Sequence, residues 1–282
     1  MESREFLELL YQGAEGYTYL WKLPEKQTVS FSLDQLDAMT RMAHEEGAAY
    51  RRDMFFSVGI SAGEYPSNKR AKNEDIIAIP ALWVDIDIAG AGHTAKNLPP
   101  DYASARALLP GAIDPTAIVM SGHGIHAYYV MREAMPTMTE AERSEAVDLL
   151  RRLQYVVRAN ADVHGWIVDN TTDLARVLRL PGTMNFKGAP IACEVVEYDA
   201  ARLYNPEDFD ILPPVEEAAS KAVRKTKFER RQTDGDAKLM LANCAFLQHF
   251  QQNYKTLPEP VWKAACTNLM RGVGGEDLIV PL

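Results

Sequence analysis

Hydrophobic residues recur at helical spacing in two segments of the chain, residues 32–47 and 137–161. Short runs rich in β-branched and aromatic residues predict strands in between and afterwards. These runs are residues 54–60, 81–88, 117–120, 125–130 and 191–198. Strands dominate the centre, helices flank them and no internal repeat is visible, so the pattern predicts an α+β fold.

The pattern changes after Leu212. Residues 213–235 begin with two prolines and carry many charges but few large apolar residues, which is typical of a linker. Helical periodicity then returns at 239–250 and 258–270. We therefore expect a main domain over 1–212, a charged linker over 213–235 and a small helical piece over 236–282, which we interpret as incomplete.

Composition places the chain among folded proteins. Of its 282 residues, 47% are hydrophobic and 24% are charged, which argues against wholesale disorder. No apolar run reaches the roughly 20 residues of a membrane-spanning helix, and the N-terminus lacks a signal-peptide pattern. Three scattered cysteines form neither a disulfide framework nor a zinc-binding pair. We expect a soluble protein of the cytoplasm.

The net charge of −9 argues at first against a nucleic-acid partner, because Lys and Arg drive phosphate binding. The basic residues are concentrated, however: residues 69–72 and 221–231 hold nine of the thirty Lys and Arg. The first group lies among turn-forming residues, which predicts an exposed basic loop. Its members Lys69, Arg70 and Lys72 are candidate DNA-binding residues.

Two aspartates stand two residues apart near the end of the expected central strand. Because side chains alternate along a strand, Asp85 and Asp87 share a face with Trp83. Carboxylates placed in this way can bind a pair of divalent metal ions, as phosphoryl and nucleotidyl transfer require. The competing interpretation is a strand end whose acids simply meet solvent.

A glycine-rich turn, Ser121-Gly122-His123-Gly124, joins two expected strands. Glycines in such a turn let backbone N–H groups approach a phosphate closely. His126 follows on the second strand and shares a face with Tyr128, where it could donate a hydrogen bond to an anionic oxygen. The alternative is a buried histidine with a purely structural role.

A third cluster runs from Asp173 to Lys187. Arg176 and Arg179 are three residues apart and would share a face if the segment were helical, and Arg binds phosphate oxygens through two parallel hydrogen bonds. We expect Pro181 to end this helix, with Asn185 and Lys187 in the following turn. A surface helix with a weak Asp173–Arg176 ion pair is the simpler interpretation.

In this order and spacing, the three clusters resemble the archaeo-eukaryotic primase superfamily, specifically the primase-polymerases of phages, plasmids and other mobile elements. The resemblance covers about residues 30–200, and the run from Asp173 to Lys187 is its most specific part. It implies a catalytic core built on an RRM-like sheet with a second αβ unit, here residues 1–212. It also implies a two-metal site for Mg²⁺ or Mn²⁺, NTP or dNTP substrates and a single-stranded DNA template. The cytoplasm it implies is that of a bacterial, archaeal or phage-infected host cell.

The same resemblance assigns roles to individual residues. Asp85 and Asp87 would bind the metals, and the third acid would be Asp169 or Asp173. His126 would act beside the acids as a triphosphate donor. The implied nucleotide-binding residues are Ser121, Gly122, His123, Gly124, His126, Arg176, Arg179, Asn185 and Lys187.

Residues 243–262 resemble the start of the helical primase C-terminal domain that often follows such cores. In relatives a helicase often comes next, so a replicative helicase in the same chain or a separate one is an expected partner. A truncated chain and a stand-alone primase both fit the sequence.

Two other functions fit parts of the sequence. A rolling-circle nickase would use His123 and His126 to hold a metal and Tyr128 or Tyr129 to attack DNA. However, residues three apart in a strand do not face the same way, and this function leaves Asp85 and the arginines unused. A non-catalytic replication-initiator module would bind DNA through the basic loop and linker, with purely structural acids.

Overall fold

The computed structural model describes residues 1–90, 97–214, 237–253, 256, 265–266 and 269. The chain divides into two compact units, Met1–Lys221 and Ala222–Leu282. The expected linker lies almost entirely outside the described residues, so its bounds of 213 and 235 remain predictions.

The first unit is built on a nine-stranded sheet, with strand order β11-β6-β7-β5-β4-β1-β3-β8 and β2 paired to β1. The strands of one half are β1 (Tyr17–Leu23), β2 (Gln27–Ser32), β3 (Asp53–Ser57), β4 (Ile60–Ser61) and β8 (Val177–Arg179). Those of the other half are β5 (Ile76–Asp87), β6 (Ala117–Met120), β7 (Gly124–Pro136) and β11 (Glu194–Tyr198). Two short strands, β9 (Met184–Asn185) and β10 (Ile191–Ala192), form a separate antiparallel pair.

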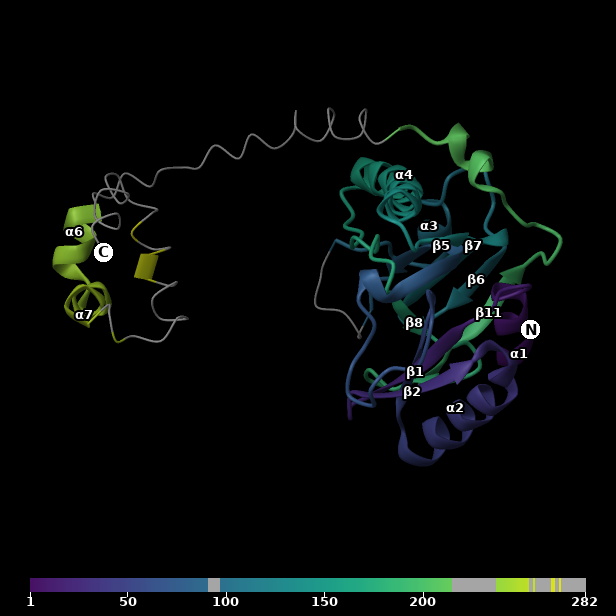
Figure 1. Cartoon of the computed structure of the whole chain (residues 1–282). Coiled ribbons are helices and arrows are strands. Elements are labelled where there is room, and N and C mark those ends of the chain that lie inside the picture. Colours follow the sequence, from purple (N-terminus) through teal and green to yellow (C-terminus); the bar gives the residue numbers. More distant parts are fainter. Residues whose placement is uncertain (91–96, 215–236, 254–255, 257–264, 267–268, 270–282) are drawn as a thin grey trace. The chain divides into compact units, whose positions relative to one another are not determined.

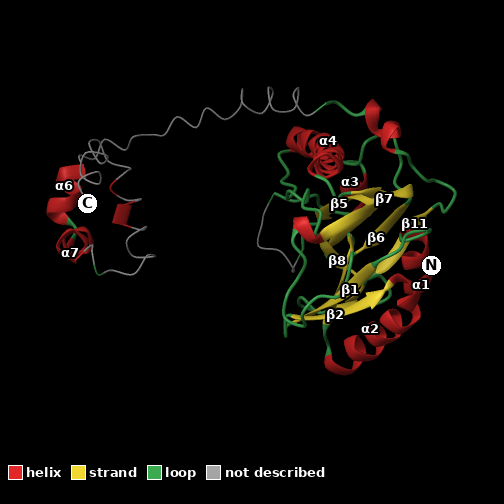
Figure 2. Cartoon of the chain, viewed as in Figure 1, coloured by secondary structure: helices red, strands yellow, loops and turns green. Residues whose placement is uncertain are grey.

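Helices cover both halves of the sheet. The helices are α1 (Ser3–Leu10), α2 (Leu36–Tyr50), α3 (Tyr102–Arg106) and α4 (Glu140–His164), with short 3-10 turns η1 (Leu33–Gln35), η2 (Asn73–Asp75) and η3 (Pro206–Ile211). Helix α4 lies over β5 and β7, and α2 lies against the β1–β3 half (Figure 1). Strands and helices are thus mixed along the chain, which confirms the predicted α+β class (Figure 2).

The two long helices confirm the expectation from periodicity. In α4, Thr139 accepts a hydrogen bond from the Glu142 amide, and Glu142 accepts one from the Thr139 amide, which forms a capping box. The helix ends at His164 and is capped by Gly165, whose φ of +71° suits a residue without a side chain. Its buried face includes Leu150 and Leu153, at the predicted spacing.

Three strand predictions need adjustment. The expected strand 54–60 is two strands, because the chain turns at Val58 and Gly59, where the Val58 amide donates to the Arg176 carbonyl at 2.9 Å. Strand β5 begins at Ile76, before Pro80, and the β5–β7 register shifts between Ile79 and Ala81. This irregularity accommodates the missing N–H of Pro80. The expected strand 191–198 is divided between β10 and β11.

The helix expected over 173–180 is wrong. Residues 177–179 form strand β8, which pairs with β3 and places Leu178 opposite Phe56 in the core. Leu174 and Leu178 fit a helical spacing, but the alternation of half-buried Val177, buried Leu178 and half-buried Arg179 has the period of a strand. Pairing with the distant strand β3 decides between helix and strand here, and the local sequence pattern does not reveal that pairing.

The second unit contains α6 (Ala237–Asn243) and α7 (Ala245–Asn253). Leu247 and Phe250 are buried with Ala265 and Leu269 in a small core of its own. The helix expected over 239–250 is thus divided at Cys244, and most of the one expected over 258–270 lies outside the described residues. No helix in the described part of the chain is long and apolar enough to cross a membrane.

Replacing Gly124 with alanine is expected to destabilise the first unit. The added Cβ would lie 2.5 Å from the Ile86 carbonyl oxygen on the neighbouring strand. Overpacking of this kind costs about 1–3 kcal/mol of unfolding free energy, which urea unfolding would measure. Gly111→Ala is the matched control, because nothing lies within 4 Å of its added Cβ. Equal losses in both variants would contradict this steric explanation.

Candidate functional site

Two carboxylates lie on one side of β5, close to its end. Asp85 and Asp87 are half-buried and line the same cavity, as their spacing predicts. Trp83, on the same face, is instead fully buried and donates its indole N–H to the Thr171 carbonyl at 2.9 Å. The core therefore covers this face of β5 at Trp83 but no longer fully covers it at Asp85 and Asp87.

Strand β7 places His126 beside the acids. In the antiparallel β5–β7 pair, His126 lies opposite Asp85 and Gly124 lies opposite Asp87. Opposite residues share a face and have close Cβ atoms. The absence of a side chain at Gly124 lets the two strands approach closely beside the acid pair.

The turn before β7 is tied to the segment after β8. Asn185, which is buried, donates from Nδ2 to the Ser121 carbonyl at 2.7 Å. The His123 ring Nε2 lies 2.6 Å from the Lys187 carbonyl oxygen. Gly122 has a φ of +96°, and a side chain there would press on Asn185 at 3.0 Å. The glycine-rich turn and the Asn185–Lys187 turn thus form one connected wall.

Arg179 enters the same cavity from β8. Its Nη1 donates to Asp53 Oδ1 at 2.6 Å, and its guanidinium lies 4.6 Å from the centre of the Phe55 ring. The Phe186 amide donates to the same Asp53 oxygen at 2.7 Å. One carboxylate oxygen therefore positions both the arginine and the turn that carries Lys187.

Together these elements enclose a cavity of about 180 Å³. Its lining residues are Phe55, Asp85, Asp87, Ser121, His123, His126, Val177, Leu178, Arg179, Asn185 and Lys187. Eight of the sequence-predicted side chains therefore meet there, from three separate parts of the chain: Asp85, Asp87, Ser121, His123, His126, Arg179, Asn185 and Lys187. Gly122 and Gly124 shape the turn that carries Ser121 and His123.

His126 is 4% exposed and is neutral at pH 7. Burial, with the charge of Arg179 as the second cause, lowers the pKa of His126 to about 3. Its Nε2 lies 3.6 Å from Asp85 Oδ1, which is longer than a hydrogen bond, and a neutral ring makes no ion pair. Its Nδ1 is buried without a partner among the described residues. A neutral ring keeps one N–H group, which could donate a hydrogen bond to a ligand oxygen.

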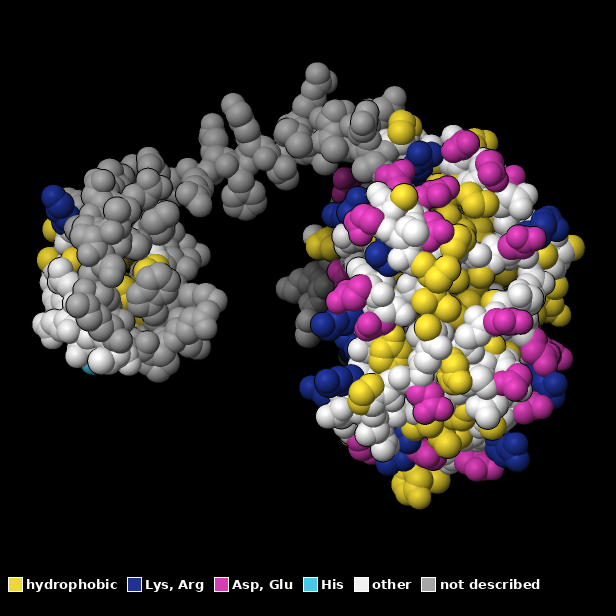
Figure 3. Space-filling view, in the orientation of Figure 1, with side chains coloured by type: hydrophobic (Ala, Val, Ile, Leu, Met, Phe, Trp, Pro, Cys, Tyr) yellow, Lys and Arg dark blue, Asp and Glu magenta, His cyan; other side chains and the backbone are white. Residues whose placement is uncertain are grey.

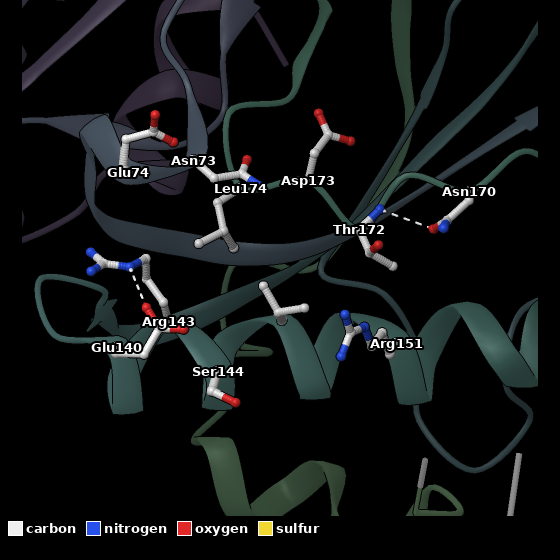
Figure 4. A pocket seen from close by; sticks show the side chains of 11 residues that line it. Asn73, Glu74, Glu140, Arg143, Ser144, Arg151, Asn170, Thr172, Asp173 and Leu174 are labelled. Carbon is white, nitrogen blue, oxygen red and sulfur yellow. Dashed lines mark hydrogen bonds and ion pairs between the residues drawn. The ribbon is translucent and has the colours of Figure 1, made fainter. Parts of the chain in front are cut away.

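The candidates for a third acid do not line this cavity. Asp169 is exposed, and Asp173 accepts a hydrogen bond from the Arg176 guanidinium. Asp173 lines a different cavity, of about 720 Å³, between the segment 170–174 and the start of α4. Figure 4 shows Asp173 across this cavity from Arg143 and Arg151 of α4.

Arg176 and Arg179 do not act from one face, because the segment is not helical. Arg176 lies just before β8 and donates to Asp173 and to the Asn170 carbonyl. It does not line the cavity of the acid pair, although its charge also contributes to lowering the pKa of His126. The two predicted arginines are therefore in different surroundings.

The acid pair suits a divalent cation that also binds a ligand. Mg²⁺ is usually held by one or two carboxylates together with substrate phosphates and water. Asp85 and Asp87 supply two such carboxylates in one cavity. Within the described ranges, no group of three or more His, Cys, Asp or Glu residues could hold a metal ion. The donor set fits a cation shared with a phosphate-bearing ligand.

Sequence reasoning missed Asp53 and Phe55. Both lie on β3, far from the recognised motifs. Through the pairing of β3 with β8, Phe55 lines the cavity and Asp53 holds Arg179. Phe55 stands directly opposite Arg179 in that pair. Nothing in the local sequence distinguishes these residues from other strand residues.

The overall fold is similar to that of solved primases. The primase-polymerase (PrimPol) AEP domain of cyanophage S-2L aligns with a TM-score of 0.49 and 16% identity, over 74% of this chain and 95% of that one. The catalytic domain of primase RepB′, in complex with initiator DNA, gives 0.41 and 11%, over 81% and 100%. Primase RepB′ gives 0.43 and 12%, over 95% and 86%.

No protein-family model and no curated protein matches the chain. At these identities the similarity to the solved structures concerns the fold alone.

Removing the Asp53 carboxylate is expected to destabilise the side of the cavity that Arg179 and the Asn185–Lys187 turn form. In Asp53→Ala the Arg179 guanidinium and the Phe186 amide lose a shared acceptor, and the two side chains of the ion pair are only 12% and 19% exposed. Hydrogen bonds to charged groups contribute about 1.5–3 kcal/mol, so the unfolding free energy should fall by about 2 kcal/mol in urea titrations. Asp53→Asn, which keeps an acceptor oxygen, should lose less.

Asp210→Ala provides the control, because Asp210 is 73% exposed in its ion pair with Arg152 and should matter little. Wild-type stability in Asp53→Ala would disprove the anchoring role.

Proposed function

We propose that the protein is a template-dependent nucleotidyl transferase, a DNA primase, a DNA polymerase or both, that makes and extends primers for a phage, plasmid or other mobile element. One observation carries the proposal: paired carboxylates, a buried neutral histidine and an arginine meet in a single cavity. This set matches nucleotidyl transfer, in which acids hold cations and cationic groups hold the triphosphate.

Asp85 and Asp87 are the proposed ligands of Mg²⁺ or Mn²⁺. When bound, such ions would lower the pKa of the attacking 3′-hydroxyl and stabilise charge on the phosphates. The half-buried position of both acids and their shared cavity support this role. Asp169 and Asp173 are the proposed candidates for the third carboxylate of a two-metal site, and neither lines this cavity.

The other cavity residues are proposed to bind the triphosphate of an NTP or dNTP. Arg179 offers a planar set of donors whose direction Asp53 fixes, and Lys187 offers an exposed point charge. His126 would donate one hydrogen bond from its neutral ring, because its lowered pKa leaves it uncharged at pH 7. Catalysis would then rest on positioning and electrostatics.

The proposed template is single-stranded DNA, guided by the basic loop. Lys69, Arg70 and Lys72 are exposed, as the sequence predicts. On the face of the first unit seen in Figure 3, basic side chains are interspersed with acidic ones. We therefore expect template binding to be weak and sensitive to salt.

The burial of two tyrosines argues against a rolling-circle nickase. A nucleophilic tyrosine must reach the scissile phosphate. Tyr128 and Tyr129 are both fully buried, and burial raises the pKa of each hydroxyl above its ordinary value. Neither phenol can meet DNA without unfolding the centre of β7.

A primer-extension assay tests the proposal against a non-catalytic initiator module. Wild-type protein with a single-stranded template, NTPs or dNTPs and Mg²⁺ or Mn²⁺ should give labelled product. The double variant Asp85→Asn, Asp87→Asn should lose at least about 1,000-fold in rate, because it removes the charges that hold the cation. A second double variant, Glu133→Gln, Glu194→Gln, removes two charges from exposed positions on β7 and β11 and should keep its activity.

Failure of the wild-type protein to make product would overturn the polymerase proposal. Equal product from the Asp85, Asp87 variant would overturn the site assignment.

Nucleotide titration tests the proposed binding of the triphosphate by Arg179. Arg179→Ala should raise the KM for nucleotide by about 10- to 100-fold with a smaller effect on kcat, because it removes charge-assisted hydrogen bonds to the triphosphate. Arg202→Ala, which removes an arginine outside the cavity, serves as the control. An unchanged KM in Arg179→Ala would show that the arginine does not bind nucleotide.

A further inference from the structure

Two aromatic rings lie in a row that leads to the cavity. Trp21 of β1 stands directly opposite Phe55 of β3, and Phe55 stands directly opposite Arg179 of β8. Directly opposite residues of antiparallel strands share a face. The three side chains therefore follow one another across three neighbouring strands, and we refer to Trp21 and Phe55 as the aromatic strip.

The aromatic strip faces away from the helix that covers this half of the sheet. The alternate residues Lys22 and Met54 point to α2: Lys22 pairs with Glu46 at 2.9 Å, and Met54 lies next to Gly47. Lys22 and Met54 are buried, whereas Trp21 and Phe55 are only half-buried. Two large rings thus remain partly accessible on the face opposite α2, although Tyr19 of the same face is buried beside Tyr65 and Ala71.

The basic loop is fixed at the outer end of the strip. Thr28 of β2 stands opposite Trp21 and donates from Oγ1 to the Lys69 carbonyl at 2.6 Å. The Arg70 guanidinium lies 5.6 Å from the centre of the Trp21 ring. At the inner end, Phe55 and Arg179 line the cavity that contains Asp85. One guanidinium group therefore lies over each ring of the strip, Arg70 over Trp21 and Arg179 over Phe55.

We propose that the aromatic strip is a stacking platform for the bases of the single-stranded DNA template. Proteins that bind single strands combine cationic groups for the backbone with aromatic side chains for the bases. Arg70 and Arg179 supply the charge, and Trp21 and Phe55 supply the rings. The inference rests on the proposed function for the identity of the strand as a template.

The dimensions of the strip favour a strand over a free nucleotide. Neighbouring strands are about 4.8 Å apart, so the row from Thr28 to Arg179 crosses about 14 Å of sheet. One base covers only one ring of this row. A polynucleotide would engage both rings and the basic loop while its end lies near Asp85 and Asp87.

Binding of a fluorescein-labelled single-stranded oligonucleotide of about 16 nucleotides tests the platform. Fluorescence anisotropy in EDTA measures affinity without nucleotidyl transfer. Trp21→Leu and Phe55→Leu should each weaken binding about 10-fold, since a leucine keeps apolar bulk but cannot stack. Trp21→Phe should bind nearly as well as wild type. Thermal unfolding of each variant would separate loss of stacking from loss of folding.

Tyr198→Leu is the matched control, because Tyr198 is a 57% exposed aromatic residue on β11, at the opposite end of the sheet. It should bind like wild type.

A second strand of the same length without bases isolates stacking from phosphate contacts. Wild-type protein should prefer the intact strand over this abasic strand, and the double variant Trp21→Leu, Phe55→Leu should bind both alike. Arg70→Ala should lower the salt dependence of binding by the equivalent of about one phosphate contact. It should keep the preference for the intact strand over the abasic strand.

Wild-type affinity in both single Leu variants, an equal loss in Tyr198→Leu, or no binding of single-stranded DNA by the wild type would overturn the platform. Strip-dependent binding without any polymerase product would overturn the proposed function and leave the platform standing.

Discussion

The register between β5 and β7 is the constraint on which the cavity depends. It places Asp85 opposite His126 and Asp87 opposite Gly124. A slip by one residue would turn every side chain of one strand to the other face. Leu82 and Val84 alternate with Trp83 and are fully buried, so such a slip would expose core residues and bury the acids. The hydrophobic core therefore fixes the position of the polar site.

The remaining cavity residues depend on ties between segments that are distant in the chain. Asn185 joins its turn to Ser121, and Asp53 joins the same turn to Arg179 through one oxygen atom. Both tying side chains are largely buried, where an unpartnered polar group is costly. Because breaking either tie is unfavourable, the turn and Arg179 keep a defined position. A long exposed arginine side chain without such partners would not.

The sequence predicts those parts of the site that local pattern determines. The spacing of Asp85 and Asp87 follows from strand alternation, and the glycine turn identifies the neighbourhood of His126. The roles of Arg179 and Asp53 depend instead on the β3–β8 pairing, which joins residues more than 100 positions apart. The spacing of Arg176 and Arg179 suggested a helix where the structure has β8, because pairing with β3 outweighs local preference. Side-chain contacts between distant strands leave no local signature.

The charges of the cavity bear on the net charge of −9, which taken as a whole argues against a nucleic-acid partner. Asp85 and Asp87 line the cavity together with Arg179 and Lys187, so its charges balance, and His126 stays neutral because burial lowers its pKa to about 3. Under the proposed function, the phosphates of a free nucleotide would lie close to two carboxylates and be repelled by them. A divalent cation bound with the nucleotide would offset that repulsion at the acids while the phosphates reach Arg179. The paired acids therefore favour the metal-bound form of a nucleotide over the free form.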